Sequence, residues 1–282
     1  MTTTDRGVGQ RVEDAKEGMN MTTMMTKADR LMKTLCAAVV MVLAVTAASA
    51  ADLDSWRAGT VVSAQEVTRY GVDRCFAIEQ ISDAVFARMR YSYMPNPHIA
   101  RADLRYLRLL HRDAHDRIVL GEMVCHRRIA ADLVAIFRQL YDAHYPIARM
   151  VLVDEYRADD ETSMRANNTS CFCYRTVAGS RKVSAHAMGM AVDINPLYNP
   201  YVKRRANGRL FIQPANAEPY THRERRFDYK IERGDLCHRL FLQHGFSWGG
   251  AWRSLKDYQL VLAAAPGIEP EFYDAHISGS NV

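Results

Sequence analysis

Residues 184–196 read Ser-Ala-His-Ala-Met-Gly-Met-Ala-Val-Asp-Ile-Asn-Pro, and this stretch constrains the fold and the chemistry most strongly. His186 and Asp193 lie seven positions apart, with Gly189 between them and a strand-like Ala-Val-Asp-Ile run at the end. Neutral imidazole and carboxylate are both Zn²⁺ ligands, at roughly 2.0–2.2 Å from the metal. Because glycine relaxes a turn, both side chains can fold back onto one ion. The stretch therefore predicts a turn and a strand that carry two metal ligands.

The first fifty residues carry the pattern of an export signal. Basic residues at 27–33 precede an apolar run at 35–45, and Ala48-Ser49-Ala50 follows it. A basic start, a short apolar run and a small-residue cleavage site are typical of a secretory signal peptide. The apolar run is shorter than the roughly 20 residues that a membrane-spanning helix needs. We therefore expect a leader at 1–50 with the signal at about 25–50, export to the periplasm or the extracellular space, and no stable membrane span after cleavage. An N-terminal membrane anchor is the alternative.

The composition is that of a globular protein. The 282 residues are 48% hydrophobic and 24% charged, with a net charge of +5. The chain that remains after the leader is long enough for one domain with a good core. The positive balance is mild, and no run of lysine and arginine is long enough to indicate nucleic-acid binding.

Five cysteines follow the leader. An exported chain can form disulfides, but an odd number leaves at least one thiol unpaired. We expect these residues to be packing residues or to form a structural disulfide, and we assign none of them a catalytic role. They are Cys75, Cys125, Cys171, Cys173 and Cys237.

The periodicity of apolar residues predicts both strands and helices. Alternation predicts a hairpin, and apolar residues spaced by three and four predict helices. Because these elements follow one another in irregular order, they indicate an α+β domain. We expect strands at 104–110 and 117–124 joined through 111–116, a helix at 129–141, a strand at 150–154, a short strand ending at Tyr174, little regular structure at 196–226, and a helix at 235–244.

Three further motifs accompany the 184–196 stretch. They are Asp-Asp-Glu-Thr-Ser-Met-Arg-Ala-Asn-Asn-Thr-Ser at 159–170, Tyr174-Arg175, and Trp248-Gly249-Gly250. Together the motifs resemble the zinc D-alanyl-D-alanine carboxypeptidase-like peptidases, which include the D,D-dipeptidases and D,D-carboxypeptidases of vancomycin resistance and phage L-alanyl-D-glutamate endopeptidases. The resemblance covers roughly residues 104–259.

The resemblance implies a fold and a domain organisation. It implies one α+β domain at 101–262, with a mixed or antiparallel sheet and flanking helices, of the hedgehog/D,D-peptidase type. An N-terminal segment at 51–100 would lead into this domain, and an atypical tail at 263–282 would follow it.

The resemblance also implies roles for four residues. His186 and Asp193 match the first two zinc ligands. Arg175 matches the arginine that polarises the scissile carbonyl or steadies the anionic intermediate, a role that suits a planar cation. Asp257 matches the carboxylate of a closing acid-x-x-His motif, the general base for metal-bound water. An ion-paired or surface position is the alternative for Arg175, and an exposed loop is the alternative for Asp257.

The closing motif lacks its histidine. The chain reads Asp257-Tyr258-Gln259-Leu260-Val261, where the family would have histidine and an aromatic residue in the last two places. Leucine offers no donor atom to a metal, so the third ligand is missing. Three explanations remain open: a relative without catalysis, a tail that is not the natural ending, or a substitute ligand. The candidates for a substitute are His238, His244 and His276.

Two functions follow from the resemblance. The first is an exported zinc-dependent peptidase that acts on D-amino-acid-containing stem peptides of peptidoglycan, impaired because position 260 is leucine. It would be a D,D-carboxypeptidase or a related endopeptidase. The alternative is a non-catalytic relative that binds the same peptides on the same scaffold. No Ser-x-x-Lys or Gly-x-Ser-x-Gly pattern indicates a serine nucleophile.

Overall fold

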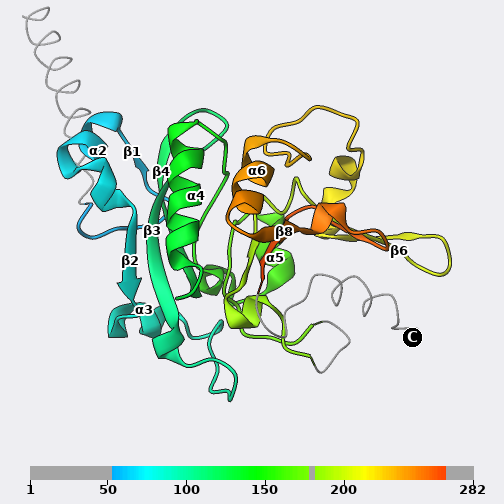
Figure 1. Cartoon of the computed structure of the whole chain (residues 1–282), viewed down its shortest axis with the longest axis horizontal. Coiled ribbons are helices and arrows are strands. Elements are labelled where there is room, and N and C mark those ends of the chain that lie inside the picture. Colours follow the sequence, from blue (N-terminus) through cyan, green and yellow to red (C-terminus); the bar gives the residue numbers. More distant parts are fainter. Residues whose placement is uncertain (1–52, 178–181, 265–282) are drawn as a thin grey trace, which may run out of the picture. The chain divides into compact units, whose positions relative to one another are not determined.

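Three small antiparallel sheets and several helices make up the part of the chain that the computed structural model describes, residues 53–177 and 182–264 (Figure 1). This α+β arrangement agrees with the expected fold class. The leader at 1–50 and residues 265–282 of the tail lie outside the described residues. Among the helices that are described, none is long and apolar enough to cross a membrane.

The largest sheet has the strand order β1-β4-β3-β2. Its centre is the hairpin of β3 (Leu104–Arg112) and β4 (Ile118–His126), which confirms the two strands expected there. The edge strands β1 (Val61–Val62) and β2 (Ala77–Gln80) pair with β4 and β3 respectively. Residues that precede position 100 therefore complete this sheet.

Helix α4 (Ala130–Asp142) lies between this sheet and helix α6 (Leu236–Gln243) (Figure 1). The apolar residues of α4 recur at spacings of three and four and are buried, as the sequence predicts. Phe137 of α4 meets Phe241 of α6 edge to face, with ring centroids 6.3 Å apart. One continuous core therefore runs from the sheet through α4 to α6.

The shorter helices begin at side-chain caps. The residue before each helix accepts a hydrogen bond from a backbone N–H of the first turn, which otherwise has no partner. These helices and their caps are α2 (Ala64–Tyr70) with Ser63, α3 (Asp83–Arg88) with Ser82, and α5 (Asp160–Arg165) with Asp159.

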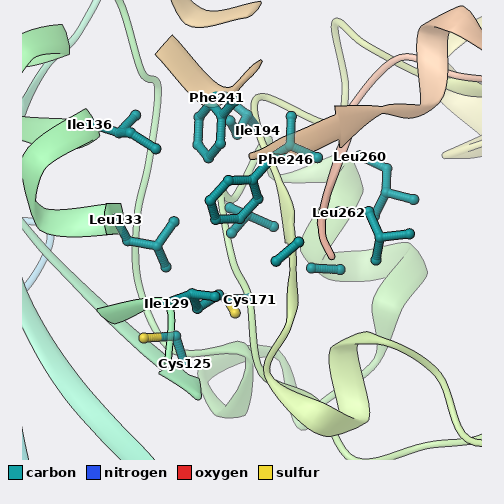
Figure 2. Packing of buried hydrophobic residues seen from close by; sticks show 14 of the residues in the cluster. Cys125, Ile129, Leu133, Ile136, Cys171, Ile194, Phe241, Phe246, Leu260 and Leu262 are labelled. Atoms are coloured by element: carbon teal, nitrogen blue, oxygen red, sulfur yellow. The ribbon is translucent and has the colours of Figure 1, made fainter. Parts of the chain in front are cut away.

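A second sheet, ordered β5-β10-β8, carries part of the 184–196 stretch. Its strands are β5 (Ala191–Asp193), β10 (Leu260–Ala263) and β8 (Phe246–Trp248). Every residue of the central strand β10 is buried, as expected for a strand covered on both faces. Figure 2 shows the alternate residues Leu260 and Leu262 on the same side of this strand.

A third sheet, ordered β7-β6-β9, corrects one expectation. The region 196–226 contains the hairpin of β6 (Tyr201–Arg204) and β7 (Leu210–Gln213), followed by the 3₁₀ helix η5 (Ala215–Thr221). β6 also pairs with β9 (Lys256–Asp257). The prolines favoured irregular structure, but Pro200 and Pro214 stand just outside the strands, where a missing N–H removes no ladder hydrogen bond, and Pro219 lies within η5.

The strand expected at 150–154 does not form. Residues 150–152 are buried but pair with no strand, and the 3₁₀ helix η3 (Val153–Tyr156) follows. The side chain of Asn168 takes the place of a neighbouring strand: its Oδ1 accepts from Val151 N at 2.9 Å, and its Nδ2 donates to Val151 O at 3.0 Å. An apolar run predicts burial here, but an amide side chain supplies the hydrogen bonds.

The short strand expected to end at Tyr174 is also absent. Phe172, Cys173 and Tyr174 donate their backbone N–H groups to three different neighbours. Since no two consecutive bonds go to the same segment, no ladder forms. The acceptors are the carbonyls of Val124, His186 and Ser92.

Candidate functional site

His186 and Asp193 face each other across a tight turn. His186 opens the 3₁₀ helix η4 (His186–Met188), and Gly189 then turns the chain into β5 at φ 63°. A Cβ on Gly189 would lie 2.6 Å from the backbone nitrogen of His126, so this close approach requires glycine. Nε2 of His186 lies 3.4 Å from Oδ2 of Asp193. The structure therefore brings the two expected metal ligands together.

The second ring nitrogen of His186 orients the imidazole. Its Nδ1 donates to the carbonyl of Cys171 at 2.8 Å, which leaves Nε2 pointing at Asp193. Burial lowers the pKa of His186, but the charge and hydrogen bond of Asp193 outweigh burial, so the pKa lies above its usual value. A metal at Nε2 would compete with a proton for this nitrogen.

Arg175 is ion-paired with a residue that the sequence did not single out. Its Nη2 lies 2.7 Å from Oδ2 of Asp160, the first residue of α5. The carbonyl of Arg175 accepts from Ser184 N at 3.1 Å, which holds the arginine beside the 184–196 stretch. Burial raises the pKa of Asp160, although Arg175 and His186 act to lower it. The only sequence signal for Asp160 is its place in the motif at 159–170.

Asp257 is buried in β9, so the alternative of an exposed loop acid is wrong. The strand packs closely on Gly249, where an added Cβ would lie 2.8 Å from the Cβ of Asp257. Burial, followed by the charge of Asp193, raises the pKa of Asp257 to about 8. Its Oδ1 is buried without a hydrogen-bond partner among the described residues. Asp257 therefore keeps its proton to a higher pH than an exposed aspartate does, and it lies close enough to Asp193 for the two charges to interact.

Leu260 stands where a third ligand would be needed. The register of β10 on β5 sets it directly opposite Asp193. Opposite residues of an antiparallel pair share a face, with Cβ atoms about 4.5–5.5 Å apart. Leu260 is only 5% exposed and belongs to the main core. The departure from the family pattern therefore lies beside the two candidate metal ligands.

The histidines proposed as substitutes do not fill this gap. His238 packs its ring on Trp248, with centroids 5.1 Å apart, and His244 places Nδ1 2.9 Å from Oδ1 of Asp132. Within 53–177 and 182–264, no group of three or more His, Cys, Asp or Glu side chains is arranged to hold a metal. The hypothesis is therefore wrong for His238 and His244, while His276 lies outside the described residues.

The five cysteines are buried and carry free thiols, so in this structure they are packing residues rather than a disulfide.

The donor atoms fit zinc only in part. Two atoms bound tetrahedrally at about 2.0–2.1 Å from one ion lie about 3.4 Å apart, close to the observed spacing of the His186 and Asp193 atoms. Oδ1 of Asp193 is also buried and without a hydrogen-bond partner among the described residues. However, Leu260 contributes nothing. The described residues supply two ligands and do not fit a hydrolytic zinc site with three.

Comparison with known families agrees with the motifs. Residues 178–259 match a family described as D-alanyl-D-alanine carboxypeptidase, and the match ends one residue before Leu260. Searches of curated proteins and of solved structures gave no significant match. The family match includes His186, Asp193 and Asp257. The match at residues 178–259 confirms the resemblance of this chain to the zinc D-alanyl-D-alanine carboxypeptidase-like peptidases.

Proposed function

We propose that this protein binds peptidoglycan stem peptides that end in D-alanyl-D-alanine and hydrolyses them slowly or not at all. The observation that carries the proposal is Leu260 opposite Asp193, in a site that otherwise keeps His186 and Asp257. The family match supports a peptidase-like function on such peptides. The missing donor supports binding without efficient turnover, because two ligands leave a metal-bound water without fixed geometry.

Two side chains near Leu260, those of Arg175 and Asp257, have the chemistry to bind the C-terminal end of a peptide. Arg175 offers a planar cation to a peptide carboxylate or carbonyl. A protonated Asp257 donates a hydrogen bond to a carbonyl oxygen, and in that state it does not act as a base. These groups can hold and orient a peptide without activating water.

Weak zinc binding belongs to the same proposal. The distance between the donor atoms of His186 and Asp193 suits zinc, so we expect zinc to occupy this position in a fraction of the molecules. The same distance supports a second candidate function, a zinc-dependent D,D-carboxypeptidase or endopeptidase of low activity. Export to the periplasm or the extracellular space is proposed from the leader pattern at 1–50. A D,D-peptidase-type fold is proposed from the family match at 178–259, within the domain expected at 101–262; strands β1 and β2 extend its largest sheet to residues before 101.

Calorimetric titration in a chelator tests binding without metal. We expect the purified protein to bind a peptide ending in D-Ala-D-Ala, and its counterpart ending in L-Ala-L-Ala at least about tenfold more weakly. Arg175→Gln should weaken binding of the D,D peptide by about tenfold, the cost of a lost charge-assisted hydrogen bond. The control Arg165→Gln removes an arginine that pairs with Glu161 on the surface of α5, and it should bind normally. Binding that appears only after zinc is added would contradict the proposal.

A further inference from the structure

One face of the β6–β7 hairpin continues outward from Asp257. Tyr201 of β6 stands directly opposite Asp257 of β9, and Lys203 stands opposite Phe211 of β7. Opposite residues of an antiparallel pair share a face, as do alternate residues of one strand. Tyr201, Lys203 and Phe211 therefore lie on the same side of this sheet as Asp257.

Side-chain contacts agree with this register. The rings of Tyr201 and Phe211 meet edge to face, with centroids 6.1 Å apart. Arg205 follows β6 and places its guanidinium carbon 4.7 Å from the centre of the Phe211 ring. Burial and the charge of Asp257 both raise the pKa of Tyr201, as expected if its hydroxyl lies near that carboxyl. We call these four residues the Tyr201 face: Tyr201, Lys203, Arg205 and Phe211.

The hairpin is strongly cationic. Residues 201–213 contain three arginines and one lysine but no aspartate or glutamate. None of these cations forms an ion pair with any residue in the described part of the chain. Figure 1 shows the hairpin extending away from the sheets that hold the core. Lys203 is thus a positive charge on the face that continues from Asp257, and among residues 53–177 and 182–264 no carboxylate pairs with it.

We propose that the Tyr201 face is a second binding subsite, at which Lys203 pairs with a carboxylate of the bound peptide. This subsite rests on the proposed function, since the first residue of the terminal D-alanyl pair, whose carbonyl would accept a hydrogen bond from Asp257, must lie beside that residue. A strand advances about 3.4 Å per residue, so Lys203 lies about 7 Å beyond Tyr201. That distance equals two residues of an extended peptide. The ligand is therefore a peptide with an acidic residue two positions before its terminal D-alanyl pair. The rings of Tyr201 and Phe211 offer an apolar surface to the part of the peptide between the acidic residue and the D-alanyl pair.

A matched pair of peptides tests this subsite on the full chain. Ac-Glu-Ala-D-Ala-D-Ala carries the carboxylate, and Ac-Gln-Ala-D-Ala-D-Ala carries an uncharged amide of the same shape. We expect the Glu peptide to bind about three- to fivefold more tightly at low salt, the size of a partly exposed ion pair, with the preference lost at high salt. Lys203→Glu should abolish or reverse the preference.

Arg204→Glu is the control. It makes the same change of charge one residue along β6, where alternation sets the side chain on the opposite face. This variant should keep the preference for the Glu peptide. Equal affinity of the unaltered protein for both peptides, or equal effects of the two variants, would overturn the subsite while leaving the proposed function intact. If neither peptide bound, the proposed function would fail, and the subsite with it.

Discussion

Asp257 shows at the scale of one residue how burial changes what a carboxyl can do. Burial and Asp193 raise its pKa to about 8, whereas an aspartate in an unfolded chain has a pKa near 3.9. Between these values the folded state holds a proton that the unfolded state releases. The free energy of unfolding therefore falls as the pH rises from about 4 to about 8.

Replacing Asp257 with asparagine should remove this dependence. An amide resembles the protonated carboxyl and never ionises, so Asp257→Asn should raise the thermal midpoint at pH 8 by several degrees and change it little at pH 4. Thermal unfolding in a chelator, at both pH values, measures this difference. A stabilisation of equal size at both pH values would show that the pKa of Asp257 is not raised.

His111 has the opposite pH dependence. It is buried in β3, where Nδ1 donates to the carbonyl of Ile147 at 2.8 Å, and burial lowers its pKa to about 4. An unfolded histidine titrates near 6.5, so the unfolded state binds more protons between pH 6.5 and 4. Stability from this residue is therefore complete above pH 6.5 and is lost as the pH falls through that window.

His111→Gln tests this effect. Glutamine keeps a hydrogen-bond donor but cannot be protonated. Between pH 6.5 and 4, the slope of the free energy of unfolding against pH should therefore fall in the variant by up to the contribution of about one bound proton. At pH 7 it should be less stable by about 1–3 kcal/mol, because the buried carbonyl loses an ideal partner. Urea unfolding across this range measures both quantities, with the exposed His115→Gln as the control. An unchanged slope for His111→Gln would contradict the assignment.

At the scale of elements, the connection from η4 to β5 sets the distance between the two metal-ligand candidates. Gly189 allows both the positive φ and the contact with the backbone of His126. Gly189→Ala should cost about 1–3 kcal/mol of stability. It should also weaken peptide binding, because His186 and Asp193 flank the displaced turn.

Gly208→Ala is the matched control. Gly208 also has a positive φ, 80°, but an added Cβ there would meet no atom within 4 Å. Gly208→Ala should lower the stability of the protein by about 1 kcal/mol through backbone strain and should leave peptide binding unchanged. If Gly189→Ala bound the peptide as well as Gly208→Ala does, the turn would not control the site.

Element-scale signals also explain which parts of the fold could be predicted. The β3–β4 hairpin, α4 and α6 are long periodic segments, and their periodicity is visible in the sequence. The strand predicted at 150–154 was wrong because the side chain of Asn168, rather than a neighbouring strand, forms the hydrogen bonds to Val151. The strands of the β6–β7 hairpin were missed because they have four residues each and mix apolar with charged side chains.

At the scale of the whole molecule, the site could be predicted only where its geometry is local. His186 and Asp193 share one turn, so their spacing already indicated convergence. Asp257 was identified by family resemblance, since nothing local distinguishes it from an exposed acid. The pairing of Leu260 with Asp193 and of Tyr201 with Asp257 depends on strand registers between distant segments. The spacing of residues within one segment does not show how that segment pairs with a distant strand.

The zinc content of the purified chain, measured together with release of D-alanine from a D-Ala-D-Ala peptide, tests the central claim most directly. We expect the unaltered protein to retain much less than one zinc per chain after dialysis and to release D-alanine slowly. Leu260→His should approach about one zinc per chain and release D-alanine at least about tenfold faster, because it restores a third ligand. Leu262→His, on the same side of β10 but opposite Ala191, should do neither. Full zinc occupancy with rapid release of D-alanine by the unaltered protein would contradict the account.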